Sequence, residues 1–246
     1  MKLVLCYHSI DDSESVISTS RIDFVRHMEW LAQSHFQVVP LGEILTAPGD
    51  DLVALTFDDG YVNFETVALP ILTDLALSST VFVVSGRAGG ENDWDAQSAQ
   101  IPSLRLMDWD ATARCMERGA EIGAHGRNHM HLRGLPSERL AEEIAGCADD
   151  IETALGAVPE SFAYPYGSYD DRVERLAAKS YKDICTTDLR LLAPSDQRQA
   201  IPRIDSYYVR EPGRIESLGS PAFPLYINAR RGGRAIRNAI SSLERS

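Results

Sequence analysis

One stretch of the chain, residues 52–60, constrains the fold more than any other, because its apolar residues end abruptly in two carboxylates and a glycine. An apolar run of this length that ends at a glycine predicts a buried strand. In parallel α/β folds the carboxyl ends of such strands face the active site. Because successive side chains of a strand point in opposite directions, Asp58 and Asp59 are expected at one mouth of the fold with different partners. Two close carboxylates repel each other, and a metal ion resolves this by binding one and leaving the other free as a base.

The rest of the chain alternates between strand and helix patterns without an internal repeat. This alternation predicts a single α/β domain with a parallel sheet, either a barrel or a doubly wound sheet. A Gly-rich polar stretch, residues 86–103, is interpreted as a flap on the substrate side. Apolar spacing predicts helices near residues 24–32, 61–77, 106–118, 137–155 and 170–179, and further strands near residues 2–7, 37–39, 80–84, 120–124, 161–164, 182–186 and 201–204.

The net charge, the composition and the cysteine count argue against some functions and favour a reducing compartment. A net charge of -12 and a pI near 4.9 argue against a nucleic-acid footprint, which needs a basic face. Polar residues arrive too early for an export signal, and no apolar run is long enough to span a membrane, so we expect a cytoplasmic protein. Four widely spaced cysteines without a CxxC pattern fit reduced thiols better than disulfides: Cys6, Cys115, Cys147 and Cys185.

The end of the chain is basic, in contrast to the acidic total. A catalytic domain is predicted over residues 1–215 and a C-terminal extension over residues 216–246. The spacing of apolar residues in this extension predicts a short basic amphipathic helix. Packing of this helix on the acidic body is favoured over a membrane or partner contact. The prediction depends on Ile236, Ile240 and Leu243 at helical spacing and on Arg230, Arg231, Arg234, Arg237 and Arg245 against the single acid Glu244.

Two histidines four residues apart, His125 and His129, follow the strand predicted near residues 120–124. If this segment turns helically, both rings lie on one face, which is a spacing suited to holding one metal ion. With one carboxylate from the Asp58–Asp59 pair they form three protein ligands and an open position, as in a catalytic zinc site. Taken alone, such a pair is a weak signal. The histidines interpreted as bystanders are His27, His35 and His131.

Three short segments in order resemble the first three motifs of the polysaccharide deacetylases of carbohydrate esterase family 4. They are Thr-Phe-Asp-Asp-Gly at residues 56–60, His-Gly-Arg-Asn-His at 125–129 and Phe-Ala-Tyr-Pro-Tyr-Gly at 162–167. The similarity extends over residues 3–203. It implies a distorted (β/α) barrel, usually of seven strands, and a metal-dependent hydrolase that removes N- or O-acetyl groups from sugars.

The resemblance also implies roles for individual residues. Asp58 would be the general base, while Asp59, His125 and His129 would bind the metal. Tyr166 would help to bind the acetyl group through its backbone N–H. In this mechanism metal-bound water attacks the acetyl carbonyl and passes a proton to Asp58, and the metal and the N–H of Tyr166 hold the oxyanion. Zinc suits this ligand set best, although cobalt, nickel and iron would also bind.

The chain departs from the family pattern in two places. The third motif commonly opens with an arginine that holds the base, and Ala163 stands there; the later motif with a catalytic histidine is absent. Tyr-His-Ser at residues 7–9 resembles the branch of poly-N-acetylglucosamine deacetylases, in which that histidine comes from near the start of the domain. His8 is therefore predicted to protonate the departing amine, with a structural histidine as the alternative.

Three residues are predicted on the substrate side. Tyr166 rests on the motif, and Trp94 in the long loop is a candidate for stacking on a sugar ring. Arg203 is grouped with them and is also a candidate to replace the missing arginine, with a surface salt bridge as the alternative.

Together these features predict a hydrolase that removes an N-acetyl group from a sugar, an oligosaccharide or a lipid-linked or nucleotide-linked glycan precursor. The protein would be cytoplasmic, with a peripheral contact at the membrane left open through its basic tail. One alternative is hydrolysis of a non-sugar amide or imide on the same fold. The other is a catalytically inactive carbohydrate-binding protein, which the intact Asp58, Asp59, His125 and His129 argue against.

Overall fold

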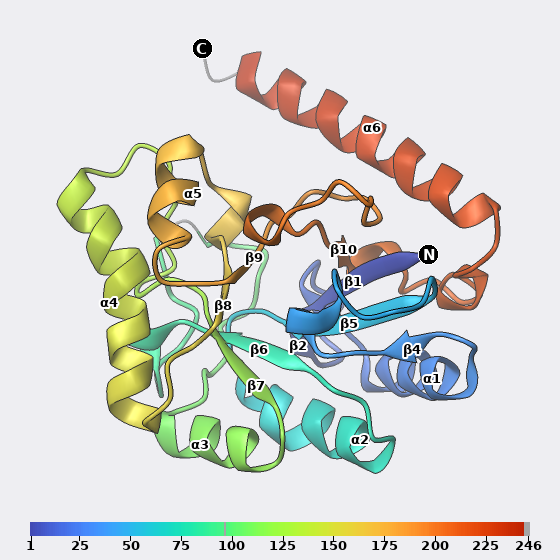
Figure 1. Ribbon diagram of the computed structural model, residues 1–246, viewed down its shortest axis with the longest axis horizontal. Coiled ribbons are helices and arrows are strands. Elements are labelled where there is room, and N and C mark those ends of the chain that lie inside the picture. The colour runs from blue at the N-terminus through green and yellow to red at the C-terminus, as the bar shows by residue number, and fades with distance from the viewer. Residues whose placement is uncertain (96, 244–246) are drawn as a thin grey trace.

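A curled parallel sheet forms the centre of the computed structural model, which describes residues 1–95 and 97–243 and the side chains up to residue 236 (Figure 1). Its strands follow the order β10-β1-β5-β6-β7-β8-β9, and each neighbouring pair is parallel. Their bounds are β1 (Lys2–Tyr7), β5 (Leu52–Phe57), β6 (Thr80–Val83), β7 (Glu121–Ala124), β8 (Ser161–Ala163), β9 (Asp183–Cys185) and β10 (Ile204–Asp205).

The segment around Ile201 closes this sheet into a barrel. Ile201 forms a parallel bridge with Cys185 at the end of β9. Three residues later Ile204 in β10 pairs with Leu5 of β1, so the two edges of the sheet are joined. The predicted distorted (β/α) barrel of about seven strands is confirmed, and the doubly wound alternative is wrong. A further strand, β4 (Gln37–Val38), pairs with the start of β5.

The helices lie on the outside of the sheet. They are α1 (Arg21–Gln33), α2 (Leu69–Asp74), α3 (Trp109–Glu117), α4 (Ser137–Leu155), α5 (Asp171–Ala177) and α6 (Ala222–Leu243). The connections contain the short strands β2 (Ser9–Ile10) and β3 (Ser18–Thr19), a π-helical turn at Phe64–Ala68 and 3-10 turns at Leu41–Glu43, Ser85–Arg87, Pro165–Gly167, Arg198–Ala200, Ser206–Tyr208 and Ile215–Ser217. Among the helices described, none has the length and apolar character needed to cross a bilayer.

Two predicted helices begin later than expected. The helix expected over residues 61–77 begins as the π-helical turn at Phe64 and restarts as α2 just before Pro70, as a proline inside the helical pattern predicts. The helix expected from residue 106 begins at Trp109, because Leu106 forms a bridge with Tyr61 and the Asp108 side chain caps the first turn. At this second helix a tertiary contact and a local hydrogen bond prevailed over apolar spacing.

The two faces of the sheet carry different side chains. The outward face packs large residues such as Leu55 and Phe57 against the helices. The barrel interior alternates with it and holds a smaller cluster that includes Ala54, Phe82 and Ala163. Asp58 continues the interior row of Ala54 beyond the end of β5, so strand alternation aims it into the barrel mouth.

Core packing in the barrel interior is tight at Gly123 of β7. A Cβ atom there would lie 2.6 Å from both Phe82 Cε1 and Ser161 Oγ. We expect Gly123→Ala to lower the free energy of unfolding by about 1–3 kcal/mol, since overpacking forces neighbouring side chains to move. The matched control is Gly146→Ala in α4, where the nearest atom is 3.5 Å away and alanine should stabilise the helix by about 0.5–1 kcal/mol. Urea unfolding followed by circular dichroism measures both; equal midpoints would contradict the prediction.

Candidate active site

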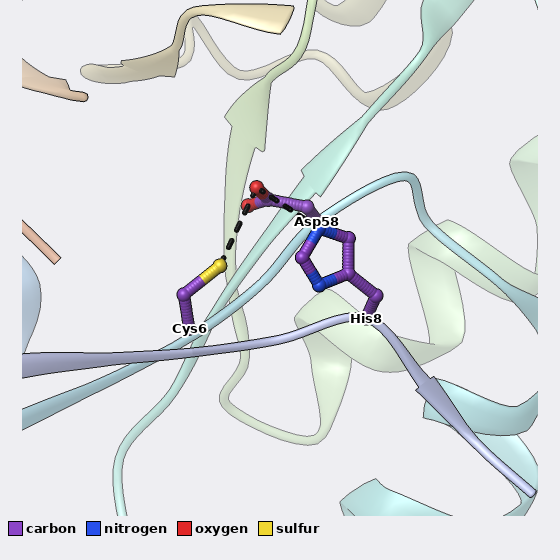
Figure 2. Close-up of side chains that lie close together, drawn as sticks. All are labelled: Cys6, His8 and Asp58. Atoms are coloured by element: carbon purple, nitrogen blue, oxygen red, sulfur yellow. Dashed lines mark hydrogen bonds and ion pairs between the residues drawn. The ribbon is translucent and has the colours of Figure 1, made fainter. Parts of the chain in front are cut away.

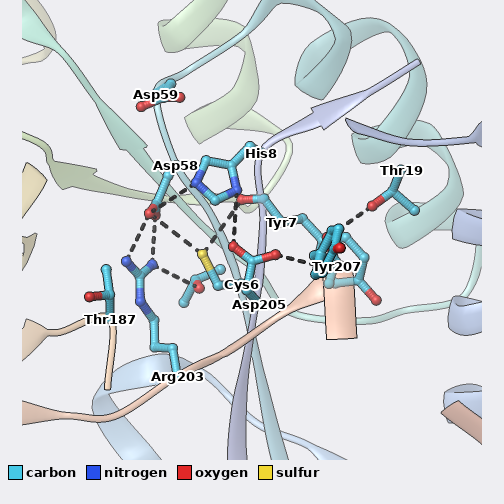
Figure 3. Close-up of polar contacts among 12 residues, drawn as sticks. Cys6, Tyr7, His8, Thr19, Asp58, Asp59, Thr187, Arg203, Asp205 and Tyr207 are labelled. Carbon is cyan, nitrogen blue, oxygen red and sulfur yellow. Dashed lines mark hydrogen bonds and ion pairs between the residues drawn. The ribbon is translucent and has the colours of Figure 1, made fainter. Parts of the chain in front are cut away.

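Asp58 and Asp59 point to different sides of the barrel mouth although they are adjacent in the chain (Figure 3). The backbone N–H of Asp58 still donates to Tyr7 O at 2.9 Å, in the manner of the strand. Asp59 then adopts a left-handed conformation, with φ of 72°, followed by Gly60 with φ of 74°. This turn breaks the strand and directs the second carboxylate towards the histidines of the neighbouring loop. Both side chains are buried, with Asp58 only 4% exposed.

Arg203 holds Asp58 in a bidentate ion pair. Its Nη1 lies 2.6 Å from Oδ1 and its Nη2 lies 2.8 Å from Oδ2, while its Nε donates to Thr186 O at 3.0 Å. Burial alone would raise the pKa of Asp58, but Arg203 and then His125 hold it at about 2. The carboxylate is therefore ionised and fixed in orientation at neutral pH.

This contact corrects the placement of Arg203 on the substrate side and the surface salt-bridge alternative, and it leaves the other alternative, replacement of the missing arginine. Arg203 is 3% exposed, and Asp58 and Thr186 occupy its guanidinium. The guanidinium also lies over the ring of Phe82, 5.6 Å from its centroid. Ala163 belongs to the same interior cluster as Phe82. Arg203, just before β10, thus reaches the carboxylate that the family resemblance assigns to an arginine at position 163.

His8 lies beside the same carboxylate, directly after β1 (Figure 2). Its Nε2 is 3.8 Å from Asp58 Oδ2, and its Nδ1 is 3.9 Å from Asp205 Oδ2. The ring is partly exposed, so it can meet a substrate at the barrel mouth. The first and last strands of the barrel are neighbours, and this adjacency brings His8, Asp58 and Asp205 together.

Cys6 is a member of this group that the sequence did not reveal. Its Sγ lies 3.5 Å from Asp58 Oδ2, so the thiol donates a weak hydrogen bond to the carboxylate (Figure 2). Burial raises the pKa of this thiol well above its usual value, which keeps the proton on sulfur. The available signal was its position two residues before His8, on the same face of β1. All four cysteines are free and buried, as expected for reduced thiols.

The second carboxylate, Asp59, lies between two imidazoles. Its Oδ1 is 3.4 Å from His125 Nε2 and 3.3 Å from His129 Nε2. The expectation that a helical turn brings the two histidines together is wrong. Residues 125–129 form an irregular turn in which Gly126 and His129 both have positive φ, of 77° and 56°. The residue spacing correctly predicted proximity, but not the conformation.

Glu143 of α4 holds the turn in this conformation. Its two carboxylate oxygens accept hydrogen bonds from the backbone N–H and the side-chain amide of Asn128, at 2.9 and 2.6 Å. Its carbonyl oxygen accepts the N–H of Arg127 at 3.2 Å. Glu143 is fully buried, although it lies on a helix that the sequence suggested only as a packing element.

Asp59, His125 and His129 fit a divalent metal ion. One ligand atom from each lies within 4.8 Å of the others. His125 Nδ1 lies 2.8 Å from Ala163 O and donates to it, so Nε2 is left with its lone pair facing Asp59. Asp59 Oδ1 is a buried oxygen without a hydrogen-bond partner among the described residues. Two imidazole nitrogens and a carboxylate are the donors that zinc and similar ions use in catalytic sites.

Two aromatic rings lie beside His129. The ring centroid of Trp94 lies 4.1 Å from that of His129, and the Tyr166 centroid lies 4.5 Å from it. Trp94 is only 4% exposed, so its role as a sugar platform stays a prediction. Tyr166 has a φ of 58° in the turn after β8. His131, interpreted as a bystander, stacks on Tyr166 at 4.1 Å and lines a cavity of about 370 Å³ with Trp94 and His129.

Comparison with known proteins decides the family. The model of the polysaccharide deacetylase family matches residues 46–182, more than half of the chain. The chain belongs to the polysaccharide deacetylase family. The matched range contains Asp58 and the three residues that fit a metal, whereas His8 and Arg203 lie outside it.

Individual relatives agree with this assignment. YxkH of Bacillus subtilis (strain 168), provisionally named a polysaccharide deacetylase, is 24% identical over 183 residues, which cover 72% of this chain and 61% of YxkH. Chitin deacetylase 1 of Cryptococcus neoformans var. grubii is 27% identical over 154 residues, 59% of this chain and 29% of that protein. The chain thus spans less than two thirds of either relative.

Two solved structures share the fold, each with a TM-score of 0.71 and 21% identity. One is the Streptococcus pyogenes deacetylase PplD in complex with acetate, with 83% of this chain and 92% of PplD covered. The other is IcaB from Ammonifex degensii, with 90% of this chain and 96% of IcaB covered.

Removing Arg203 should destabilise the fold strongly. We expect Arg203→Met to lower the free energy of unfolding by about 3–5 kcal/mol, because it leaves the Asp58 carboxylate buried without a partner. The control is Arg114→Met, which breaks a bidentate pair with Glu65 that lies at the surface and should change stability far less, because solvent screens exposed ion pairs. Chemical denaturation measures the free energy of unfolding of both variants. Similar losses of stability would contradict the prediction that burial makes the Asp58–Arg203 pair the more important of the two.

Proposed function

We propose that this protein is a metal-dependent hydrolase that removes an N-acetyl group from a sugar or a glycan precursor. The observation that carries the proposal is the position of an ionised, clamped carboxylate beside a three-residue metal site at one barrel mouth. Membership of the polysaccharide deacetylase family supports the reaction class, and the relative named a chitin deacetylase supports an N-acetylated sugar as substrate. All proposed catalytic residues lie within the predicted catalytic domain, residues 1–215.

Asp59, His125 and His129 would hold the metal, with zinc the ion that best suits them. When bound, such an ion polarises a carbonyl group and lowers the pKa of water. Glu143 shapes the turn that carries His129, and Ala163 O fixes the tautomer of His125. The protein thus arranges the donors before any ion arrives.

Asp58 is suited to act as the general base. It is ionised, and Arg203 prevents the carboxylate from rotating. A water molecule that attacks the acetyl carbonyl can pass its proton to this carboxylate. The backbone N–H of Tyr166, next to His129, is the proposed donor to the oxyanion that develops on the acetyl group.

His8 is suited to act as the general acid. Its Nε2 lies 3.8 Å from Asp58 Oδ2, an oxygen that is also 3.9 Å from His125 Nε2, and its ring is partly exposed. Asp205 Oδ2 lies 3.9 Å from its other ring nitrogen, on the side away from Asp58. The departing amine nitrogen would take its proton from His8.

Metal removal and Asp58→Asn test the proposal together. We expect zinc-loaded protein to release acetate from N-acetylglucosamine oligomers, and metal-stripped protein to release none. Asp58→Asn should lower the rate by about 10²–10⁴-fold while the metal content stays unchanged, because its side chain is the base and not a ligand. His129→Gln should lower the metal content itself, and His35→Gln, on an exposed histidine, is the control.

Other outcomes would point to other functions. Tight metal binding with turnover of small cyclic imides and no acetate release would assign the site to a non-sugar amide or imide. Oligosaccharide binding without turnover in any metal-loaded form would assign an inactive binding protein. Either result would overturn the proposed deacetylation.

The leaving group tests the role of His8. We expect His8→Gln to lower kcat on an N-acetylated sugar by about 10²–10⁴-fold, because an amine cannot leave without a proton. The same variant should hydrolyse an aryl acetate at nearly the unaltered rate, since a phenolate leaves without one. Equal losses on both substrates would assign His8 a structural role instead.

A further inference from the structure

The outer face of α6 carries apolar side chains that are open to solvent. Leu225 is 71% exposed and Ile236 is 63% exposed. Eleven residues apart, they lie on the same face of the helix, separated by about 16 Å along its axis. Ala229 and Gly232, between them on that face, are also exposed. These four residues are called the outer face of α6 below. In Figure 1 the helix forms an edge of the molecule.

The opposite side of α6 is fixed to the body. Phe223 and Ile227 belong to the main hydrophobic core. The Tyr226 hydroxyl donates to Tyr208 O at 3.0 Å, and the Arg230 guanidinium lies over the Tyr208 ring, 5.5 Å from its centroid. These contacts set the rotation of the helix about its axis, so the outer face cannot turn inward without breaking the core.

The charge of α6 is opposite to that of the rest of the protein. Residues 222–243 contain four arginines and no acid, whereas the whole chain carries a net charge of -12. Arg231 is exposed beside the outer face. An exposed apolar strip with arginines beside it is the pattern of a helix that lies in the plane of an anionic membrane.

A second copy of the chain fits this surface less well. If two outer faces met, two helices that contain arginines and no acids would lie side by side and repel each other. The remaining large exposed apolar residues among the described side chains, Val16, Ile22 and Val158, lie outside α6.

We propose that α6 binds the surface of an anionic phospholipid bilayer, with Leu225 and Ile236 inserted among the lipids and Arg231 at the headgroups. The proposal departs from the sequence-based preference for a helix that simply packs on the body. Of the predicted helix, the side chains of Arg237, Ile240 and Leu243 and the residues Glu244 and Arg245 lie outside the described part of the structure.

Membrane binding by α6 would place the candidate active site at the lipid surface. On the inner side of α6, the Arg234 guanidinium donates to Thr187 O at 2.9 Å. Thr187 packs so closely against Gly167 that a Cβ atom on residue 167 would have no room. Arg234 also lines a small cavity with His8 and Asp58. If the proposed function holds, the enzyme would act on glycans anchored to or held at a membrane; lipid binding itself does not rest on that function.

Vesicle co-sedimentation of the full chain tests the proposal. We expect binding to vesicles of phosphatidylcholine with 30% phosphatidylglycerol at about 50 mM salt, weaker binding at about 500 mM salt, and little binding to phosphatidylcholine alone. Leu225→Glu with Ile236→Glu should lower the affinity at least about tenfold, and Arg231→Gln about fivefold. Ile22→Glu and Val158→Glu, at exposed apolar positions elsewhere, are the matched controls and should bind as the unaltered protein does.

Three results would overturn the proposal. They are no binding of the unaltered protein to anionic vesicles, equal losses for the α6 and control variants, and a dimer in sedimentation velocity that Ile236→Glu dissociates. The last would assign the outer face to a second copy. Acetate release from a water-soluble oligosaccharide, measured on the same variants, keeps the two proposals separate. The α6 variants should retain this activity, and a protein inactive from the outset would count against the proposed function alone.

Discussion

The buried ion pair between Asp58 and Arg203 is the contact on which both the barrel and its candidate site depend. A carboxylate at the end of β5 cannot stay charged inside the sheet without a partner, and the partner arrives with the last strand. β10 pairs with β1 over only two residues, so backbone hydrogen bonding alone joins the edges weakly. Arg203 connects that short strand to β5 across the interior. Closure of the fold and orientation of the proposed base are therefore one structural event.

The candidate site also concentrates backbone strain. Among the described residues, five other than glycine have positive φ, and three of them are Asp59, His129 and Tyr166. At Asp59 and His129 this conformation brings a carboxylate and an imidazole within 3.3 Å of each other. Such conformations cost free energy and persist only where surrounding contacts enforce them. For His129 the enforcing contact is Glu143, which ties the turn to α4 through three hydrogen bonds.

Sequence patterns predicted a parallel α/β sheet because its strands are short apolar runs, each ending in polar residues, whereas the choice of a barrel rested on the family resemblance. They also indicated His125 and His129 together with one carboxylate of the Asp58–Asp59 pair, because strand ends in a parallel sheet converge; the resemblance selected Asp59. They left the partner of Arg203 open between the base, a substrate and a surface salt bridge, since that contact spans 145 residues and depends on how the barrel closes. Glu143 and Cys6 were missed for a related reason. An acidic residue on an amphipathic helix usually faces solvent, and a cysteine in an apolar strand usually packs in the core. The turn at residues 125–129 shows that sequence spacing can predict which side chains lie close together. It does not predict the backbone conformation that brings them together.

Because Asp58 and Asp59 are adjacent in the chain, the distances within the site differ in how easily the structure can change them. One planar peptide unit separates the proposed base from the first metal ligand, so their spacing is governed by covalent geometry. His8 comes from another strand, and its 3.8 Å approach to Asp58 is maintained only by packing. Thermal expansion or a distant cavity would therefore loosen the relation between acid and base while leaving that between base and metal ligand nearly unchanged. A partly destabilised molecule would keep the spacing of the proposed base and metal ligand and lose the approach of the proposed acid.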